Sequence, residues 1–228
     1  MKVAILGTGM VGRVIATKLR MLNHQVILGT RSVENTLNNE KKDAYGNVSF
    51  KEWHLQNSDI ELKTFADAAY EAEILFNCTG GGVSLAALEA AGKSNLDGKV
   101  LIDLANPLDF SNGMPPTLNP VNTDSLGEQI QRKFPMLKVV KTLNTMNAGL
   151  MVDPGKLKGD HNVFICGNDE AAKATAREVL QSMGWKPNLI IDLGDITNAR
   201  GTEMLLPIWL RLWNALETAE FNFHIQKN

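Results

Sequence analysis

The 228-residue sequence has little of what marks secreted, metal-binding or membrane-spanning proteins. It contains two cysteines and four histidines, and these residues do not have the spacing of metal ligands. No apolar run approaches the roughly 20 residues that span a membrane, and the first predicted strand begins at Lys2, which leaves no room for a signal peptide. We therefore expect a cytoplasmic protein without a metal site, in which Cys78 and Cys166 are buried and reduced.

A strong net charge is also missing. The 23 basic and 25 acidic residues give a formal net charge of -2, so we expect neither nucleic acid nor a membrane as a partner. A composition of 44% hydrophobic and 21% charged residues is typical of a globular protein, and the length suits one large domain or one domain with a smaller companion. These absences favour a small-molecule partner.

What the sequence does contain is a glycine-rich turn, Gly7-Thr8-Gly9-Met10-Val11-Gly12, between an apolar run and an amphipathic segment. The G-x-G-x-x-G spacing in a strand-turn-helix context is typical of dinucleotide binding. Gly7 allows a tight turn, Gly9 allows the backbone to approach a pyrophosphate, and Gly12 allows the helix to pack near the strand. The free N–H groups and the helix dipole then favour a phosphate. The alternative is an ordinary strand-to-helix turn.

The second predicted strand, residues 25–28, indicates which dinucleotide binds. Sites that prefer NAD place an acidic residue near the end of this strand, whereas this sequence continues with Gly29, Thr30, Arg31 and Ser32. Arg31 can bind phosphate oxygens, and the hydroxyl groups of Thr30 and Ser32 can donate to the same phosphate. We therefore predict NADP(H) as the cofactor. The alternative is that Ser32 caps a helix beginning near Val33 and that Arg31 is a solvated surface charge.

Further strands alternate with helices, which predicts a Rossmann-type doubly wound parallel sheet. We expect a helix over 33–45, an irregular loop over 46–58, a helix over 65–71 that Thr64 caps, and a flap without regular structure over 108–123. The remaining strands of the sheet are expected at residues 61–64, 74–78, 100–104 and 137–143.

Ligands bind along the carboxyl edge of such a sheet. We therefore predict that Thr79, Gly80, Gly81, Asn106 and Pro107 contact the cofactor. The substrate pocket is expected to comprise Gly82, Asn144, Thr145, Met146 and Asn147. The alternative for the three glycines is a flexible connection into a helix over 83–91.

The pattern changes near residue 145, so we expect an NADP-binding Rossmann domain over 1–145 and a small C-terminal α/β domain over 146–228. The smaller unit is predicted to hold a strand over 162–166, a helix that Asn168 and Asp169 start and Gly184 ends, and a strand over 189–192. Its final helix, 202–223, is too apolar for a solvated helix. It either covers the main sheet or meets another subunit in a homodimer.

No group suited to general acid–base catalysis lies at the predicted crevice, so the catalytic residues are left unassigned. Tyr45 and Tyr70 lie far from the carboxyl edge, and Lys141 lies in a strand, unlike the helical lysine of hydroxyacid dehydrogenases. Hydride is therefore expected to pass to an acceptor that is itself a redox ring. A non-catalytic NADP(H)-binding redox sensor and an NADPH-dependent reductase of a small carbonyl or imine substrate remain as alternatives.

The sequence resembles the NADPH:coenzyme F-420 oxidoreductase family in five places. These are the glycine motif, Gly29-Thr30-Arg31, the segments 139–145 and 166–169, and Asn198-Ala199-Arg200. Reductase domains of transmembrane metalloreductases share these features. The resemblance spans nearly the whole chain in order. It implies NADP(H) on the glycine loop and on Thr30 and Arg31, a deazaflavin (coenzyme F-420) or flavin over the nicotinamide as the second redox partner, and a dimer.

Overall fold

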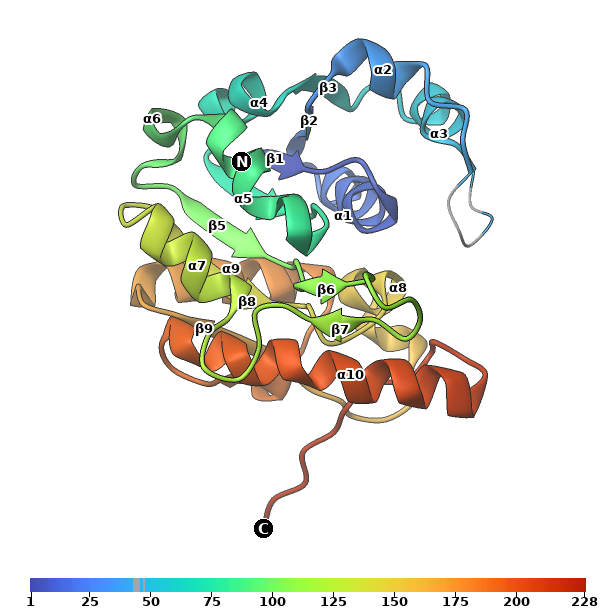
Figure 1. The fold of residues 1–228 in the computed structure, drawn as a ribbon, viewed down its shortest axis with the longest axis vertical. Helices are drawn as coiled ribbons and strands as arrows, with labels where there is room; N and C mark the ends of the chain where they lie inside the picture. Colours follow the sequence, from blue (N-terminus) through green and yellow to red (C-terminus); the bar gives the residue numbers. More distant parts are fainter. Residues whose placement is uncertain (43–45, 47) are drawn as a thin grey trace.

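The computed structural model describes residues 1–42, 46 and 48–228 of the chain. Its centre is an eight-stranded sheet with the strand order β10-β9-β8-β5-β4-β1-β2-β3 (Figure 1). The strands are β1 (Lys2–Leu6), β2 (Gln25–Thr30), β3 (Glu61–Thr64), β4 (Ile74–Asn77), β5 (Val100–Asp103), β8 (Lys138–Thr142), β9 (Val163–Gly167) and β10 (Ile190–Asp192).

The six neighbouring strands β3-β2-β1-β4-β5-β8 are all parallel, so the predicted doubly wound Rossmann-type sheet is confirmed. β9 is antiparallel to β8, with Val140 opposite Gly167, and β10 is parallel to β9. The C-terminal strands thus extend the main sheet. The domain boundary predicted at 145/146 falls in the connection between β8 and β9 and stays a prediction.

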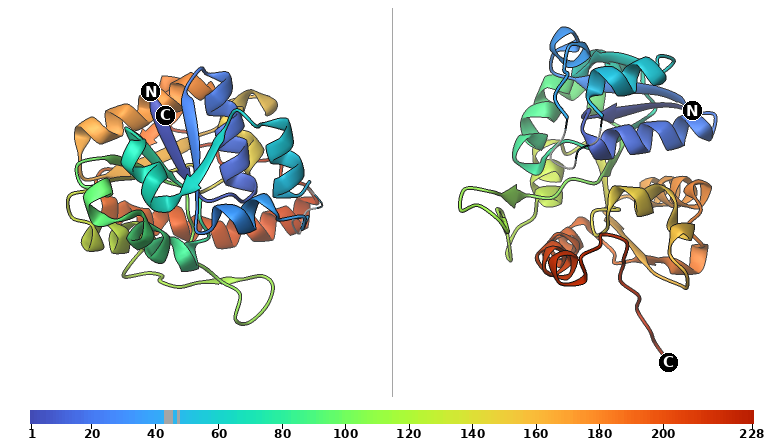
Figure 2. Two further views of the ribbon diagram at one scale, coloured as in Figure 1. Left: turned by 90° about the horizontal axis from the view of Figure 1, so that it is seen from above. Right: turned by 90° about the vertical axis from the view of Figure 1, so that its right-hand side faces the viewer.

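Helices cover both faces of the sheet, as the two views in Figure 2 show. One core cluster lies between the sheet and α1, α3, α8 and α9, and the other between the sheet and α4, α5, α6, α7 and the start of α10. The helices are α1 (Met10–Met21), α2 (Val33–Leu37), α3 (Phe50–Gln56), α4 (Phe65–Glu71), α5 (Gly81–Ala91), α6 (Lys93–Leu96), α7 (Leu126–Lys133), α8 (Ala148–Val152), α9 (Glu170–Met183) and α10 (Ala199–Leu216), with short 3-10 turns η1 (Pro154–Lys156), η2 (Pro187–Leu189) and η3 (Ile196–Asn198).

Helix caps explain where several elements begin and end. The Thr64 side chain accepts a hydrogen bond from the Asp67 amide, so α4 begins where the sequence predicts. Asp169 accepts from the Ala172 amide at 2.8 Å, and Gly184 ends α9 in the left-handed conformation with φ 113°.

Two predictions for the segment after β2 are wrong. The helix expected over 33–45 is α2 and ends at Leu37, and Asp43–Tyr45 and Asn47 lie outside the described residues. The loop expected over 46–58 contains α3, which begins with a capping box: Ser49 accepts from the Glu52 amide, and the Glu52 carboxylate accepts from the Ser49 amide.

The segment 108–123, expected as an irregular flap, contains a small hairpin. β6 (Leu108–Asp109) pairs antiparallel with β7 (Thr117–Leu118), and the loop between them extends from the body of the molecule (Figure 2). The final helix also differs from the prediction, because α10 begins earlier, at Ala199, and ends at Leu216, before a left-handed Glu217 with φ 53°.

One face of α10 packs on the rest of the chain through Ala199, Glu203, Leu206 and Trp209. The Trp209 ring stacks on Phe221 at 5.2 Å, so the chain after α10 folds back over the helix. Within the chain, α10 packs on α7 and η3, and Glu203 reaches Lys141 of β8. No helix in the described part of the chain is long and apolar enough to cross a membrane.

Candidate functional site

The glycine loop between β1 and α1 lies at the carboxyl edge of the sheet. Each of its three glycines lacks a side chain for a different structural reason. Gly7 has φ +116°, and a Cβ there would lie 2.6 Å from the Cys78 carbonyl oxygen. A Cβ on Gly12 would lie 2.1 Å from the Gly7 carbonyl oxygen, so this residue permits the close contact of helix and turn. A Cβ on Gly9 would meet nothing within 4 Å. Gly9 therefore faces open space, where a ligand can approach the backbone.

Gly9 is also the N-cap of α1, and no side chain caps this helix or adds an acid to its first turn. The amides of Met10, Val11 and Gly12 are those that an α-helix leaves without an internal partner. The first turn of α1 thus offers N–H donors and the positive end of the helix dipole to an anion. The structure supplies the context that the G-x-G-x-x-G spacing requires.

The end of β2 carries the residues predicted to select NADP(H). Arg31 is exposed, and it has no hydrogen-bond or ion-pair partner among the described residues. Ser32 is the N-cap of α2 and accepts from the Asn35 amide at 3.3 Å, which leaves its own proton free to donate. The buried Thr30 hydroxyl lies 2.7 Å from the Thr36 hydroxyl, which donates to the Ser32 carbonyl oxygen. The Thr30 hydroxyl therefore donates its proton to Thr36 of α2.

Gly29, where the acid of an NAD site is absent, is closely packed. A Cβ there would lie 2.9 Å from Leu6 and 3.2 Å from Phe65. A carboxylate side chain does not fit at this position without repacking the core between β1 and α4. An acid at position 29 would therefore require the side chains of Leu6 and Phe65 to move.

A second helix, α5, begins at the same edge. It starts at Gly81, so two of the three glycines belong to the helix and do not form a flexible connection to it. Gly80 is its N-cap and no side chain caps it. A Cβ on Gly81 would lie 2.1 Å from the Asn106 carbonyl oxygen, whereas Cβ atoms on Gly80 and Gly82 would meet nothing within 4 Å. Gly81 thus serves contact within the protein, and Gly80 and Gly82 face open space.

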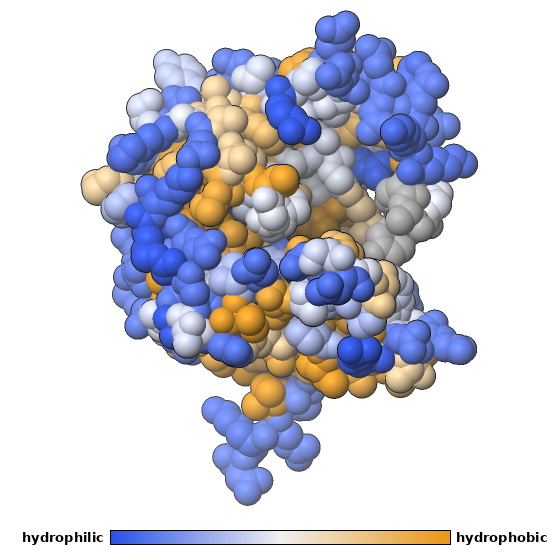
Figure 3. All heavy atoms as spheres, viewed as in Figure 1, coloured by the Kyte–Doolittle hydropathy of each residue, from blue (hydrophilic) through white to orange (hydrophobic). Residues whose placement is uncertain are grey.

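Asn106, after β5, and Asn144, after β8, form a reciprocal amide pair. Asn144 Nδ2 donates to Asn106 Oδ1 at 2.9 Å, and Asn106 Nδ2 donates to the Asn144 carbonyl oxygen at 2.8 Å. This pair brings two predicted site segments together. The surface is hollowed, with an apolar floor, between the upper and lower parts of the view in Figure 3.

Most of the other residues of the predicted substrate pocket are buried or make hydrogen bonds within the protein. Thr145 and Met146 are buried, as is Asn144. Asn147 is the N-cap of α8, where its Oδ1 accepts from the Leu150 amide at 3.1 Å, and its Nδ2 donates to the Ala219 carbonyl oxygen. Gly82 is the exposed member of this set. Direct contact of the predicted residues with cofactor or substrate stays a prediction.

A buried polar network lies directly beneath this edge. Lys141 Nζ is 2.8 Å from Asp103 Oδ2 and 2.8 Å from Glu203 Oε1, and the side chains of all three residues are at most 2% exposed. Lys141 also donates to the Ala105 carbonyl oxygen. Asp103 Oδ1 in turn accepts from Asn77 Nδ2 at 2.8 Å. The network fixes the backbone that leads from β5 into Asn106.

Burial alone would lower the pKa of Lys141, but the carboxylates of Asp103 and Glu203 raise it above its ordinary value. Glu203 also accepts from the amides of Leu126 and Gly127 at 2.9 and 3.1 Å, so it caps α7 from a distant helix. The sequence analysis missed this role. The signal was an acidic residue on the apolar face of the last helix, at the same helical spacing as Leu206 and Trp209.

Cys78 follows β4 at this edge, and His161 precedes β9. Burial, with a smaller effect of the Asp103 carboxylate, raises the pKa of the Cys78 thiol far above its ordinary value. His161 Nε2 lies 2.9 Å from the Pro154 carbonyl oxygen, and its Nδ1 lies 2.8 Å from Asn222 Nδ2. Within the described chain, no group of three or more His, Cys, Asp or Glu side chains is placed to hold a metal ion.

The sheet, the uncapped glycine loop and the basic end of β2 define a Rossmann-fold oxidoreductase that uses NADP(H). The family model for coenzyme F420-dependent NADP oxidoreductases matches residues 2–107. The structure superimposes with a TM-score of 0.93 on a candidate F420-dependent NADP reductase from Arthrobacter sp. FB24, with 59% identity over 100% of both chains. The chain belongs to the F420-dependent NADP oxidoreductase family.

Two further relatives are less similar in sequence. The F420-dependent NADP reductase of Methanothermobacter marburgensis is 26% identical over 219 residues, which cover 93% of this chain and 92% of the relative. The metalloreductase STEAP3 of Rattus norvegicus is 28% identical over 212 residues, which cover 91% of this chain. The present chain spans only 38% of the length of STEAP3.

Proposed function

We propose that the protein transfers hydride between NADPH and a ring acceptor, either the deazaflavin coenzyme F-420 or a flavin. The observation that carries this proposal is the composition of the carboxyl edge. It consists of uncapped helix ends at Gly9 and Gly80 and of the paired amides of Asn106 and Asn144, and the ionisable groups nearest to it are buried and paired. Reduction of a carbonyl or imine needs a proton donor, whereas transfer to a redox ring does not need one from the protein.

The residues at the edge fit an NADP(H) molecule. The open space at Gly9 and the amides of the first turn of α1 suit the pyrophosphate. Arg31, which has no partner within the described residues, and the free proton of Ser32 suit the 2′-phosphate. The bound cofactor supplies a hydride at its nicotinamide ring. The part of the protein is to orient the two rings and to exclude water.

The floor of the crevice supports this orienting role. The Asn106–Asn144 pair uses both side-chain amides, and Gly81 packs directly on the Asn106 carbonyl oxygen, so neither side chain can rotate without breaking a hydrogen bond. A rigid floor reduces the motion that two stacked rings must lose before hydride transfer. Asn106 and Asn144 therefore act as positioning residues in this proposal.

The test is a set of initial rates of NADPH oxidation with coenzyme F-420, FMN, FAD, aldehydes and cyclic imines, measured between pH 5.5 and 9. We expect turnover with one of the ring acceptors and a broad, flat pH profile of kcat/KM. Turnover with an aldehyde or imine alone, with a limb in the profile that disappears when one acidic residue is replaced, would contradict the proposal. Tight binding of NADPH without any turnover would instead indicate a redox sensor.

We also propose that the protein is a homodimer that uses the outer face of α10. Met204, Ile208 and Leu216 are exposed there, although the inner face of the same helix is packed on the chain. Met204, Ile208 and Leu216 are spaced at i, i+4 and i+12, so they lie on one side of the helix and form the kind of patch that an isologous interface covers.

A further inference from the structure

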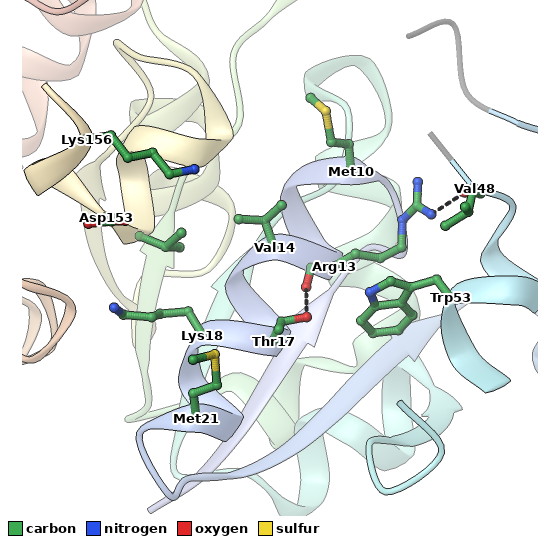
Figure 4. A pocket seen from close by; sticks show the side chains of 11 residues that line it. Met10, Arg13, Val14, Thr17, Lys18, Met21, Val48, Trp53, Asp153 and Lys156 are labelled. Atoms are coloured by element: carbon green, nitrogen blue, oxygen red, sulfur yellow. Dashed lines mark hydrogen bonds between the residues drawn. The ribbon is translucent and has the colours of Figure 1, made fainter. Parts of the chain in front are cut away.

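A cavity of about 500 Å³ lies along a face of α1 that does not contact the sheet (Figure 4). Gly12, Ile15, Ala16 and Leu19 bury the opposite face of the helix. The cavity is lined by the stripe Met10, Arg13, Val14, Thr17, Lys18 and Met21, which recurs at the i, i+3, i+4 spacing of a single helical face. α1 therefore packs on the sheet with one face and opens a cavity with the other.

The walls of the cavity come from two segments far apart in sequence. Val48 and Trp53 stand on one side, and Val152, Asp153 and Lys156 at the end of α8 stand on the other. Figure 4 shows the Trp53 ring beside Arg13 and Thr17, and the Val14 side chain on the side of α1 that faces Lys156. A volume of this size with an aromatic wall is in the range of small-molecule sites.

The polar groups that line the cavity are mostly basic. Lys18 and Lys156 have no hydrogen-bond or ion-pair partner anywhere in residues 1–42, 46 and 48–228, whereas Arg20, which does not line the cavity, is paired with Asp59 at 2.7 Å. Arg13 is buried and donates to the Val48 carbonyl oxygen at 2.6 Å, so it holds a wall of the cavity in place. The lining also contains one acid, Asp153. Its Oδ1 atom lies 3.5 Å from the position that a Cβ on Gly155 would occupy, so this oxygen is close to the backbone of its own turn.

Unpaired ammonium groups beside apolar surface attract a ligand that is apolar at one end and negatively charged at the other. We propose that the cavity binds a small organic anion, with its planar apolar part against Trp53 and Val14 and its acidic groups paired with Lys18 and Lys156. Met10 begins α1 beside the glycine loop, so the cavity adjoins the cofactor crevice. Two sources can supply such an organic anion. One is the negatively charged arm of the hydride acceptor, and the other is a separate effector molecule.

The probe for the test is 8-anilinonaphthalene-1-sulfonate, an aromatic anion, compared with the uncharged N-phenyl-1-naphthylamine. We expect one sulfonate probe to bind per chain, and the double substitution Lys18→Met and Lys156→Met to weaken its binding at least tenfold. Binding of the uncharged probe and of NADPH should change less than twofold. Lys158→Met, at an exposed lysine that does not line the cavity, is the matched control and should leave both probes unaffected.

Equal binding of the sulfonate probe to the double variant and to the wild type would overturn the proposal. So would a loss of the same size in Lys158→Met, or a change in molecular mass of the double variant by light scattering, which would make this face an interface between copies. Two inhibition patterns distinguish the sources of the anion, and both support the site. Competition of the probe with the acceptor indicates its charged arm, and non-competitive behaviour indicates an effector. The binding measurement itself does not depend on the proposed reaction.

Discussion

Replacement of Lys141 by methionine tests the buried network beneath the site. The substitution keeps most of the side-chain volume and removes a single positive charge, so Asp103 and Glu203 remain as two buried carboxylates that had shared one nitrogen. Each keeps two protein donors, namely Asn77 Nδ2 and the Ala105 amide for Asp103 and two α7 amides for Glu203. Neither keeps a full compensating charge.

Removing one partner of a buried ion pair destabilises a protein by about 3–5 kcal/mol. This is a large part of the about 5–15 kcal/mol by which native proteins are stable. With a denaturant slope near the upper end of about 1–3 kcal/mol per M, the urea midpoint of Lys141→Met should fall by about 1–2 M. Trp185 and Trp209 are buried and report the transition by fluorescence. Lys93→Met, at an exposed pair with Asp97, is the control and should leave the midpoint unchanged.

The pH dependence separates a charge effect from a packing effect. In Lys141→Met, burial and mutual repulsion should raise the folded-state pKa of one carboxyl. A group with a raised folded-state pKa contributes stability that is complete below its unfolded pKa and is lost as the pH rises through its folded pKa. The deficit should therefore shrink by up to about 1.4 kcal/mol per pH unit as the pH falls from 7 toward 5. A deficit that is equal at both pH values, or no larger than that of Lys93→Met, would refute the reasoning.

Three further predictions concern the cofactor, the edge and the oligomer. Arg31→Ala should weaken NADPH binding by about 1.5–3 kcal/mol, the range of a charge-assisted hydrogen bond, and leave NADH binding nearly unchanged in fluorescence titrations; equal losses would contradict NADP(H) selection by this residue. Gly81→Ala should lower both the melting temperature and kcat, because its Cβ would lie 2.1 Å from the Asn106 carbonyl oxygen, whereas Gly82→Ala, with nothing within 4 Å, should not lower the melting temperature. Ile208→Glu should convert a dimer to a monomer in light scattering without loss of folding, and an unchanged mass would exclude α10 from the interface.

Elements with local signals are those that the sequence predicts well. α4 follows from the Thr64 cap and α9 from Asp169 and Gly184, because a cap and its first turn lie within four residues of each other. α3 had an equally local signal in Ser49 and Glu52, and the prediction of a loop there was an error of interpretation. The antiparallel placement of β9 beside β8 has no such signal, since strand order depends on contacts between distant residues.

In the site, too, the sequence predicts local features and does not predict contacts between distant segments. The motif predicts the roles of Gly7 and Gly12, because the turn and the helix start are local. Gly81 was expected to approach a ligand, but its close neighbour is the Asn106 backbone, which lies across the edge on another strand connection. The partners of Lys141 come from β5 and α10, and only the folded chain shows that the lysine is enclosed by carboxylates.

The arrangement of charge relative to the edge explains how this surface can attract an anion without offering a proton-transfer group. Lys141, Asp103 and Glu203 lie below the edge, where they bind one another and hold the Ala105 carbonyl oxygen and Asn77 in place. The layer above them consists of helix N-termini and the amides of Asn106 and Asn144, whose dipoles do not titrate between pH 5 and 9. The potential of such an edge stays constant over that range, which suits a hydride transfer between two rings and does not suit chemistry that depends on a protein acid.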